Sequence, residues 1–267
     1  YDNQTYWVDP TLHMQGGGYK ELYCPDYGKA LIIGLPADSL QSISLPESHA
    51  FTEYFEELTV NSFSTPAKLK ITSVRHGADA DNRRSAMEYV TINNITDDLT
   101  NELKLLYPGV NQKGTPQIQD DIQKNTFTTT YDYEVEVDWH DGDQDENVLA
   151  KGFWTFKYEP LTVYQYLNLP VSTERNFDFQ LIYPLHIKVN MVFHFPKDLL
   201  IIDQYNRVDN EAYLFEEKIE QTSKNSLQIT YTLKTKTDLI KAKDYTRISD
   251  ASKKLIQGLP MIFYFNK

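Results

Sequence analysis

Apolar and polar residues alternate along several segments of this chain, and each such segment is predicted to be a β-strand. The longest alternation covers residues 127–139 and places Tyr131 and Val135 on the same side. An acidic segment, residues 141–146, interrupts the pattern before apolar positions return at residues 149–158. Because successive side chains of a strand point to opposite faces, this pattern predicts a hairpin with the acidic segment as its turn.

The other apolar segments are shorter, and their spacing separates strands from helices. Strands are predicted at residues 5–8, 29–33, 50–63, 67–74, 185–195, 199–202, 212–219, 227–235 and 261–265. Helical spacing appears at residues 80–90, at residues 96–106 after a Thr-Asp-Asp start, and at residues 244–257 before Gly258. Strands are therefore expected to dominate.

The order of these elements predicts a mainly β protein of the α+β class, with two β-sandwich-like modules and a few inserted helices. Residues 36–48 are polar and rich in turn residues, so a linker is expected there. A β-rich domain with inserted helices is expected at residues 49–175, and a C-terminal β domain with a terminal helix and strand at residues 176–267. Residues 1–35 form an opening unit whose first strand follows a turn, so we expect a partner strand before Tyr1.

Composition and charge narrow the possible partners. The 267 residues carry a formal net charge of -12, and Lys and Arg are not clustered. Nucleic acid is therefore not an expected partner, because binding to phosphates needs grouped cations. The longest apolar runs have the length of a strand, well short of the ~18 residues that suggest a membrane span.

Metal and thiol chemistry have little support in the sequence. The single cysteine, Cys24, excludes an internal disulfide and a multi-thiolate zinc site. The histidines, at positions 13, 49, 76, 140, 186 and 194, do not have zinc-ligand spacing. No cofactor is expected.

The acidic segment offers one weak candidate for a metal site. Asp141, Asp143 and Asp145 supply the oxygen ligands that calcium prefers. The EF-hand pattern fails, however, because Glu146 and Gly152 stand where that loop has glycine and glutamate. A solvated hairpin turn, charged so that it discourages edge pairing, explains the same residues.

The motif with the most chemical content is Trp7-Val8-Asp9-Pro10-Thr11. By itself it describes a strand that runs into an Asx turn, with the Asp9 carboxylate accepting hydrogen bonds from nearby backbone amides. A glycine-rich loop and then Pro25-Asp26-Tyr27-Gly28-Lys29 follow, leading into the apolar residues 30–33.

Residues 6–33 resemble the end of a transglutaminase-like core, a papain-related fold. Downstream, Gly77-Ala78-Asp79-Ala80-Asp81, the Leu105–Pro108 segment and Lys243-Asp244-Tyr245 resemble a group of large exported bacterial proteins with β domains around such a core. The resemblance implies that residues 1–35 are the C-terminal end of the core. It also implies a secreted or periplasmic location.

The resemblance carries one catalytic residue onto this chain, Asp9. In the family an Asp orients the base His, which activates a nucleophilic Cys, and the His and Cys precede the position of Tyr1. Cys24 follows Asp9 and has no matching His, so a structural thiol is expected there. The chain alone is therefore expected to have no activated nucleophile. The resemblance implies that its parent is a cysteine hydrolase or transferase acting through a thioester.

Two further groups of residues have both a structural and a functional interpretation. Asp79 and Asp81 with Arg83 and Arg84 are expected to be a helix start with local ion pairs, or else an anion site. The aromatic residues Trp139, Trp154, Tyr158, Tyr164 and Tyr166 are expected in the core, or else on a sugar-binding platform.

Two functions remain open. The first is the non-catalytic C-terminal portion of a transglutaminase-like cysteine protein, contributing Asp9 and accessory β domains. Its partners would be the N-terminal half of the same protein and a protein or peptidoglycan substrate. The second is a β-sandwich binding module for glycans or cell-envelope proteins.

Overall fold

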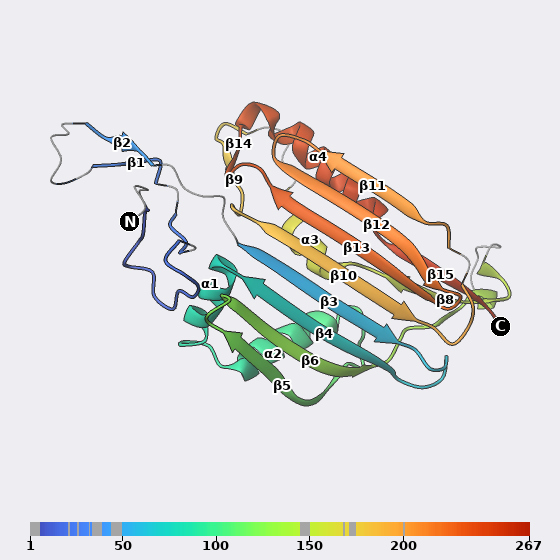
Figure 1. Cartoon of the computed structure of the whole chain (residues 1–267). Coiled ribbons are helices and arrows are strands. Elements are labelled where there is room, and N and C mark those ends of the chain that lie inside the picture. The colour runs from blue at the N-terminus through green and yellow to red at the C-terminus, as the bar shows by residue number, and fades with distance from the viewer. Residues whose placement is uncertain are drawn as a thin grey trace.

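The computed structural model describes residues 6–20, 22–25, 27–31, 33, 39–43, 50–144, 150–167, 169–170, 175–199 and 201–267. Its main feature is a twisted eight-stranded sheet with the order β11-β12-β13-β10-β3-β4-β6-β5 (Figure 1). The strands are β3 Phe51–Thr59, β4 Ala67–His76, β5 Asn111–Asp121, β6 Thr126–Val135, β10 His186–His194, β11 Gln204–Asp209, β12 Tyr213–Ser223 and β13 Ser226–Thr235.

Smaller sheets and helices accompany the main sheet. A three-stranded sheet has the order β15-β8-β7, with β7 at His140–Asp141, β8 at Phe153–Tyr158 and β15 at Met261–Asn266. Two-residue strands pair as β1 (Lys29–Ala30) with β2 (Gln41–Ser42) and as β9 (Phe179–Gln180) with β14 (Leu239–Ile240). The helices are α1 Ala78–Ala86, α2 Ile92–Leu103, α3 Leu161–Leu167 and α4 Ala242–Gly258, together with a 3-10 turn, Gly142–Gln144.

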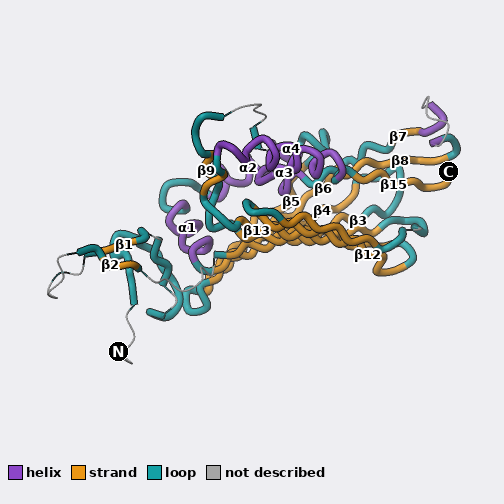
Figure 2. Tube along the Cα trace, turned by 90° about the horizontal axis from the view of Figure 1, so that it is seen from above, coloured by secondary structure: helices purple, strands orange, loops and turns teal. Residues whose placement is uncertain are grey.

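The molecule has two layers. Helices α2, α3 and α4 and the three-stranded sheet all lie on one face of the eight-stranded sheet, which we call the inner face (Figure 2). Alternation along β4 and β13 turns apolar side chains toward this layer: Leu69 and Ile71 are buried while Lys68 and Lys70 are exposed. No element of the described chain covers the opposite face (Figure 2).

The core between the two sheets is aromatic. Phe193 on β10 lies 4.9 Å from Tyr158 and 5.2 Å from Phe263, measured between ring centroids. Phe195 continues the stack at 4.7 Å from Phe265. These side chains join the last strand of the chain to the centre of the large sheet, since edge-to-face ring pairs stabilise a core beyond the area that they bury.

The predicted fold class, mainly β with a few inserted helices, is confirmed. The boundary expected near residue 176, however, does not divide the large sheet. Strand β3 pairs in parallel with β10, from Thr52 opposite Ile187 to Thr59 opposite His194. One cluster of buried residues extends from Leu58 to Phe265 and includes both expected modules. The two parts therefore share one sheet and one core.

The hairpin predicted for residues 127–139 and 149–158 is right in its acidic turn, across which β7 pairs with β8, and wrong in its first strand. Strand β6 has β4 on one edge and β5 on the other, so both of its hydrogen-bonding edges are occupied. Strand β8 pairs instead with β15 and with the two-residue β7. Alternation assigned each segment correctly to strand, but it carries no information about which strands become neighbours.

Helix α2 begins earlier than the sequence pattern suggests. Thr91 is its N-cap, and the Thr91 hydroxyl accepts a hydrogen bond from the Asn94 backbone N–H at 3.3 Å. Thr96, the expected start, lies inside the helix and donates to the Ile92 carbonyl at 2.7 Å. The helix ends at Leu103, beside the buried Tyr107. Its apolar residues face the sheet, as the predicted stripe requires.

Candidate functional site

Asp9 lies in a compact turn outside the main sheet. Its Oδ1 accepts hydrogen bonds from the Thr11 backbone N–H at 2.9 Å and from the Thr11 hydroxyl at 2.6 Å. Its Oδ2 accepts from the Tyr27 hydroxyl at 2.5 Å. The hydrogen bonds from Thr11 and then Tyr27 lower the pKa of Asp9. The carboxylate is thus ionised and fixed in orientation, and the turn amide takes one of its oxygens.

A buried ionic network connects this opening segment to the body of the protein. The Arg84 guanidinium donates to Asp81 at 3.0 Å, to Asp120 at 2.7 Å and to Asn125 at 2.6 Å. Asp81 also accepts from the backbone N–H of Gly16 at 2.9 Å. Asp81 and Arg84 therefore have a structural role, as ion pairs at the start of a helix. The network holds the glycine-rich loop against α1.

Cys24, His13 and His194 have hydrogen-bond partners in separate parts of the described fold. The Cys24 thiol donates to the carbonyl of Pro25 at 3.6 Å. His13 contacts Glu88 at 2.9 Å, and His194 contacts Ser226 at 2.9 Å on a different part of the sheet. Residue 49 lies outside the described residues. In the part of the chain that the structure describes, no three metal-ligating side chains come together.

The acidic turn is neutralised by a side chain of the protein itself. The ammonium group of Lys267 contacts both Asp141 and Asp143, and these hydrogen bonds lower the pKa of each carboxyl. Asp143 also accepts from the backbone N–H of Gly152 at 2.7 Å. Asp145 lies outside the described residues. Lys267 thus occupies the place that a cation would take between the two described aspartates.

The aromatic residues considered for a sugar platform pack against the core. Trp139 lies 4.8 Å from Phe63 and 5.7 Å from Phe265 between ring centroids. Tyr158 is 2% exposed, and Trp154, Tyr164 and Tyr166 are partly buried against the same cluster. A platform for stacking sugars needs open, flat ring faces. The structural interpretation therefore fits these residues.

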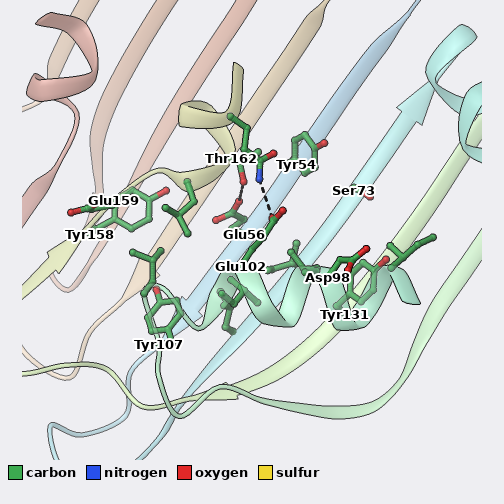
Figure 3. Close-up of a pocket in the computed structure, with 18 of the residues that line it drawn as sticks. Tyr54, Glu56, Ser73, Asp98, Glu102, Tyr107, Tyr131, Tyr158, Glu159 and Thr162 are labelled. Atoms are coloured by element: carbon green, nitrogen blue, oxygen red, sulfur yellow. Dashed lines mark hydrogen bonds between the residues drawn. The ribbon is translucent and has the colours of Figure 1, made fainter. Parts of the chain in front are cut away.

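A cavity that the sequence did not indicate lies between the inner face of the sheet and helices α2 and α3 (Figure 3). It has a volume of about 270 Å³, and its walls come from β3, β4 and β6 below and from the two helices above. Leu69 and Ile71 line the floor, while Leu99 and Leu103 line the roof. Because these walls are mostly apolar, the cavity resembles the small-molecule sites of other proteins.

One end of this cavity is formed by Glu56 and two tyrosines. The Glu56 carboxylate accepts a hydrogen bond from the Thr162 hydroxyl at 3.1 Å, as drawn in Figure 3. Burial raises the pKa of Glu56. Burial and then the Glu56 charge raise the pKa of Tyr107 and of Tyr158, which lie on the same side. The two phenols therefore stay protonated and can donate hydrogen bonds.

The other end carries cations and phenols. Arg75 on β4 and Arg83 on α1 line this cavity together with Tyr54 and Tyr131. A second cavity of about 320 Å³, which extends toward Tyr166 and α1, shares Tyr54, Arg75 and Arg83 with the first. The two arginines thus stand where the two cavities meet.

Glu56→Gln is expected to stabilise the protein at pH 8 and to have no effect near pH 4. Burial raises the folded-state pKa of Glu56 above its ordinary value of 4.5, so the folded chain holds this proton more tightly than the unfolded chain does. The stability contributed by the protonated carboxyl is present below the unfolded pKa and is lost as pH rises through the folded pKa. Urea midpoints measured at both pH values test this.

Glu57→Gln is the matched control, because Glu57 is the next residue on β3 and is exposed on the opposite face. Its substitution should change the urea midpoint little at either pH. A lower midpoint for Glu56→Gln at pH 8 would mean that the ionised carboxylate stabilises the fold, against this interpretation.

No helix of the described chain is long and apolar enough to cross a bilayer. Comparison with protein-family models, with curated proteins and with solved structures finds no match to this chain.

Proposed function

We propose that this chain is the non-catalytic C-terminal β portion of a larger transglutaminase-like cysteine protein, to which it supplies Asp9 as the orienting carboxylate. The sequence support is the resemblance of residues 6–33 to the end of such a core. The same resemblance is the reason for proposing a secreted or periplasmic location.

The observation that carries this proposal is the state of the Asp9 carboxylate. An orienting Asp has to be ionised, fixed in direction and able to accept one more hydrogen bond from an imidazole N–H. Thr11 and Tyr27 together use three of the roughly four acceptor positions of a carboxylate. One acceptor position remains, and the lowered pKa keeps the charge in place at neutral pH.

The surface of the opening segment supports the same proposal. Val8, Leu31 and Leu40 are each more than half exposed, and Ile33 is 93% exposed. A two-stranded sheet such as β1-β2 is marginally stable without further packing. Large apolar side chains gathered on so short a segment favour contact with another part of the same protein, here its N-terminal half.

The chemistry proposed for the parent is acyl transfer. A cysteine thiolate attacks the carbon of a carboxamide, ammonia leaves with a proton from the His, and a thioester forms. An amine or water then attacks the thioester, and the thiolate is released. Asp9 touches none of the reacting atoms. Its role is to hold the tautomer of the His and to stabilise the imidazolium.

Residues 1–267 alone are expected to show no thiol-dependent turnover. Cys24 is the single cysteine of this chain, and its thiol donates a hydrogen bond to the Pro25 carbonyl, whereas a nucleophilic thiol has to give its proton to a base. Release of ammonia from a glutamine-containing peptide, with and without an alkylating agent, measures this. Turnover by these residues that disappears in Cys24→Ala would contradict the proposal. In the intact parent, Cys24→Ala should leave the rate unchanged.

A second candidate function, a binding module, has its own support in the cavity beneath α2, which lies far from Asp9 along the chain. This function needs no catalytic group, and it is compatible with the first because an accessory domain can bind the substrate of its parent.

A further inference from the structure

Arg75 and Arg83 are two cations that line the same cavity, and neither forms a close ion pair with a described carboxylate, although the charge of Arg75 acts on nearby Asp79. Among the described residues, no carboxylate lies within ion-pair distance of either guanidinium, although their neighbour Arg84 pairs with two aspartates. Arg75 donates to the Ser73 hydroxyl at 2.8 Å, and the Nε of Arg83 is buried without an acceptor. Leaving a buried charged donor unpaired is costly, so such a group points to an absent acceptor.

A tyrosine beside the two arginines supplies one further hydrogen-bond donor without an acceptor. The Tyr131 side chain is 3% exposed, and its hydroxyl has no hydrogen-bond partner in the described structure. Burial, and then the charge of Arg75, lower the pKa of Arg83. Repulsion between two close cations is relieved when an anion binds between them.

We propose that Arg75 and Arg83 bind the carboxylate of a small apolar acid whose body fills the cavity beneath α2. The guanidinium fork matches the two oxygens of a carboxylate, and Tyr131 is placed to donate a further hydrogen bond. Neither the site nor the ligand depends on Asp9 or on the transglutaminase-like assignment.

The lining of the cavity decides the character of the ligand. Leu69, Ile71, Leu99 and Leu103 suit an alkyl or aryl group. In the register of β4, Arg75 stands opposite Thr52 and Ile71 opposite Glu56, so four residues, or roughly 13 Å, separate the two ends. A volume of about 270 Å³ limits the ligand to a small molecule.

The carboxylates near the site favour a ligand that carries a single negative charge. Asp98 and Glu102 on α2 line the same cavity (Figure 3), and Glu102 accepts a hydrogen bond from Gln165 at 2.9 Å. On the side of the second cavity, Asp79 accepts from the Thr52 hydroxyl at 2.8 Å, and burial raises its pKa. These groups would repel a phosphate dianion more strongly than a carboxylate. At the far end of the cavity, the raised pKa of Glu56 favours its neutral form, and a neutral carboxyl can lie beside the apolar part of the ligand.

The test is calorimetric titration of the whole chain with 3-phenylpropanoate and octanoate. The matched neutral ligand is 3-phenylpropanamide, and inorganic phosphate is the anion without an apolar body. The acids should bind at least tenfold more tightly than the amide and than phosphate. Arg83→Gln and Arg75→Gln should each weaken binding of the acids by roughly tenfold to a hundredfold, as expected for a charge-assisted hydrogen bond.

Two further variants separate loss of the site from loss of the fold. Leu99→Trp should abolish binding by filling the cavity while both arginines remain, and Arg247→Gln, on the exposed side of α4, should bind as the unaltered chain does. If an arginine variant fails to fold by circular dichroism, Leu99→Trp decides the question. Three results would each overturn the proposal. They are equal affinity for the acid and the amide, unchanged affinity in Leu99→Trp, and no detectable binding of either acid at a ligand concentration of about 10 mM.

Discussion

Asp9→Asn in the intact parent protein is expected to lower kcat by about 10⁴-fold, the loss found when an orienting Asp of a catalytic triad becomes an amide. The asparagine Oδ1 can still accept from Thr11, so the local turn should persist. The amide cannot hold the imidazole in the required tautomer or stabilise the imidazolium. A structural role in the turn alone predicts almost no change in rate.

The measurement is thioester formation and ammonia release as a function of pH, with the fold checked by circular dichroism. Asp250→Asn, an exposed carboxylate on α4, is the matched control and should leave kcat unchanged. Tyr27→Phe removes one of the hydrogen bonds that lower the pKa of Asp9, so its effect should be much smaller and should grow as pH falls toward that pKa. An unchanged rate in Asp9→Asn would leave Asp9 as a turn residue.

Phe193→Ala is expected to destabilise the whole protein by about 3–5 kcal/mol, the usual cost of truncating a fully buried phenylalanine. Phe193 is completely buried, and its ring contacts Tyr158 and Phe263 from the three-stranded sheet. Because β3 and β10 pair directly, the loss should reach both halves of the chain in one cooperative transition.

Tryptophan fluorescence and far-ultraviolet circular dichroism during urea unfolding check this. Trp139 and Trp154 lie in the first expected module, whereas Phe193 lies in the second. Both signals should therefore shift to the same lower midpoint. Phe177→Ala is the control, because Phe177 is 81% exposed and its loss should change the midpoint very little. Two separate transitions, with the fluorescence midpoint unchanged, would show that the halves unfold independently.

Several elements were predictable because their signal is local. The strands predicted at residues 185–195 and 261–265 correspond to β10 and β15 in the structure. The helix predicted at residues 244–257 corresponds to α4, which ends at Gly258. Edge strand β5 was missed because it contains Gly114, Pro116 and mostly polar side chains. A strand at the edge of a sheet has fewer neighbours and buries less surface, so its sequence alternates weakly.

The cavity beneath α2 was not predictable for a different reason. Glu56 on β3, Arg75 on β4, Arg83 on α1 and Tyr131 on β6 meet only because four separate elements pack together. In the sequence Arg83 looks no different from Arg84. Yet Arg84 is fully paired with carboxylates, and Arg83 faces the cavity with its Nε unsatisfied. The two arginines differ in whether a carboxylate lies close to them in the folded protein, and the spacing of residues along the chain does not encode that.

By itself, the sequence determined that this chain is mainly β, where most strands of the large sheet lie, and that the Asp9 carboxylate accepts a hydrogen bond from the Thr11 backbone N–H in an Asx turn. These features depend on residues within a few positions of one another, where side-chain periodicity and turn chemistry act. The strands predicted at residues 5–8 and 199–202 are wrong, because the described residues of both segments have no strand pairing. Only the tertiary structure decided that β3 lies beside β10, that Lys267 neutralises the acidic turn, and that two arginines share a cavity. Such contacts join residues far apart in the chain, and the packing of the whole core selects them.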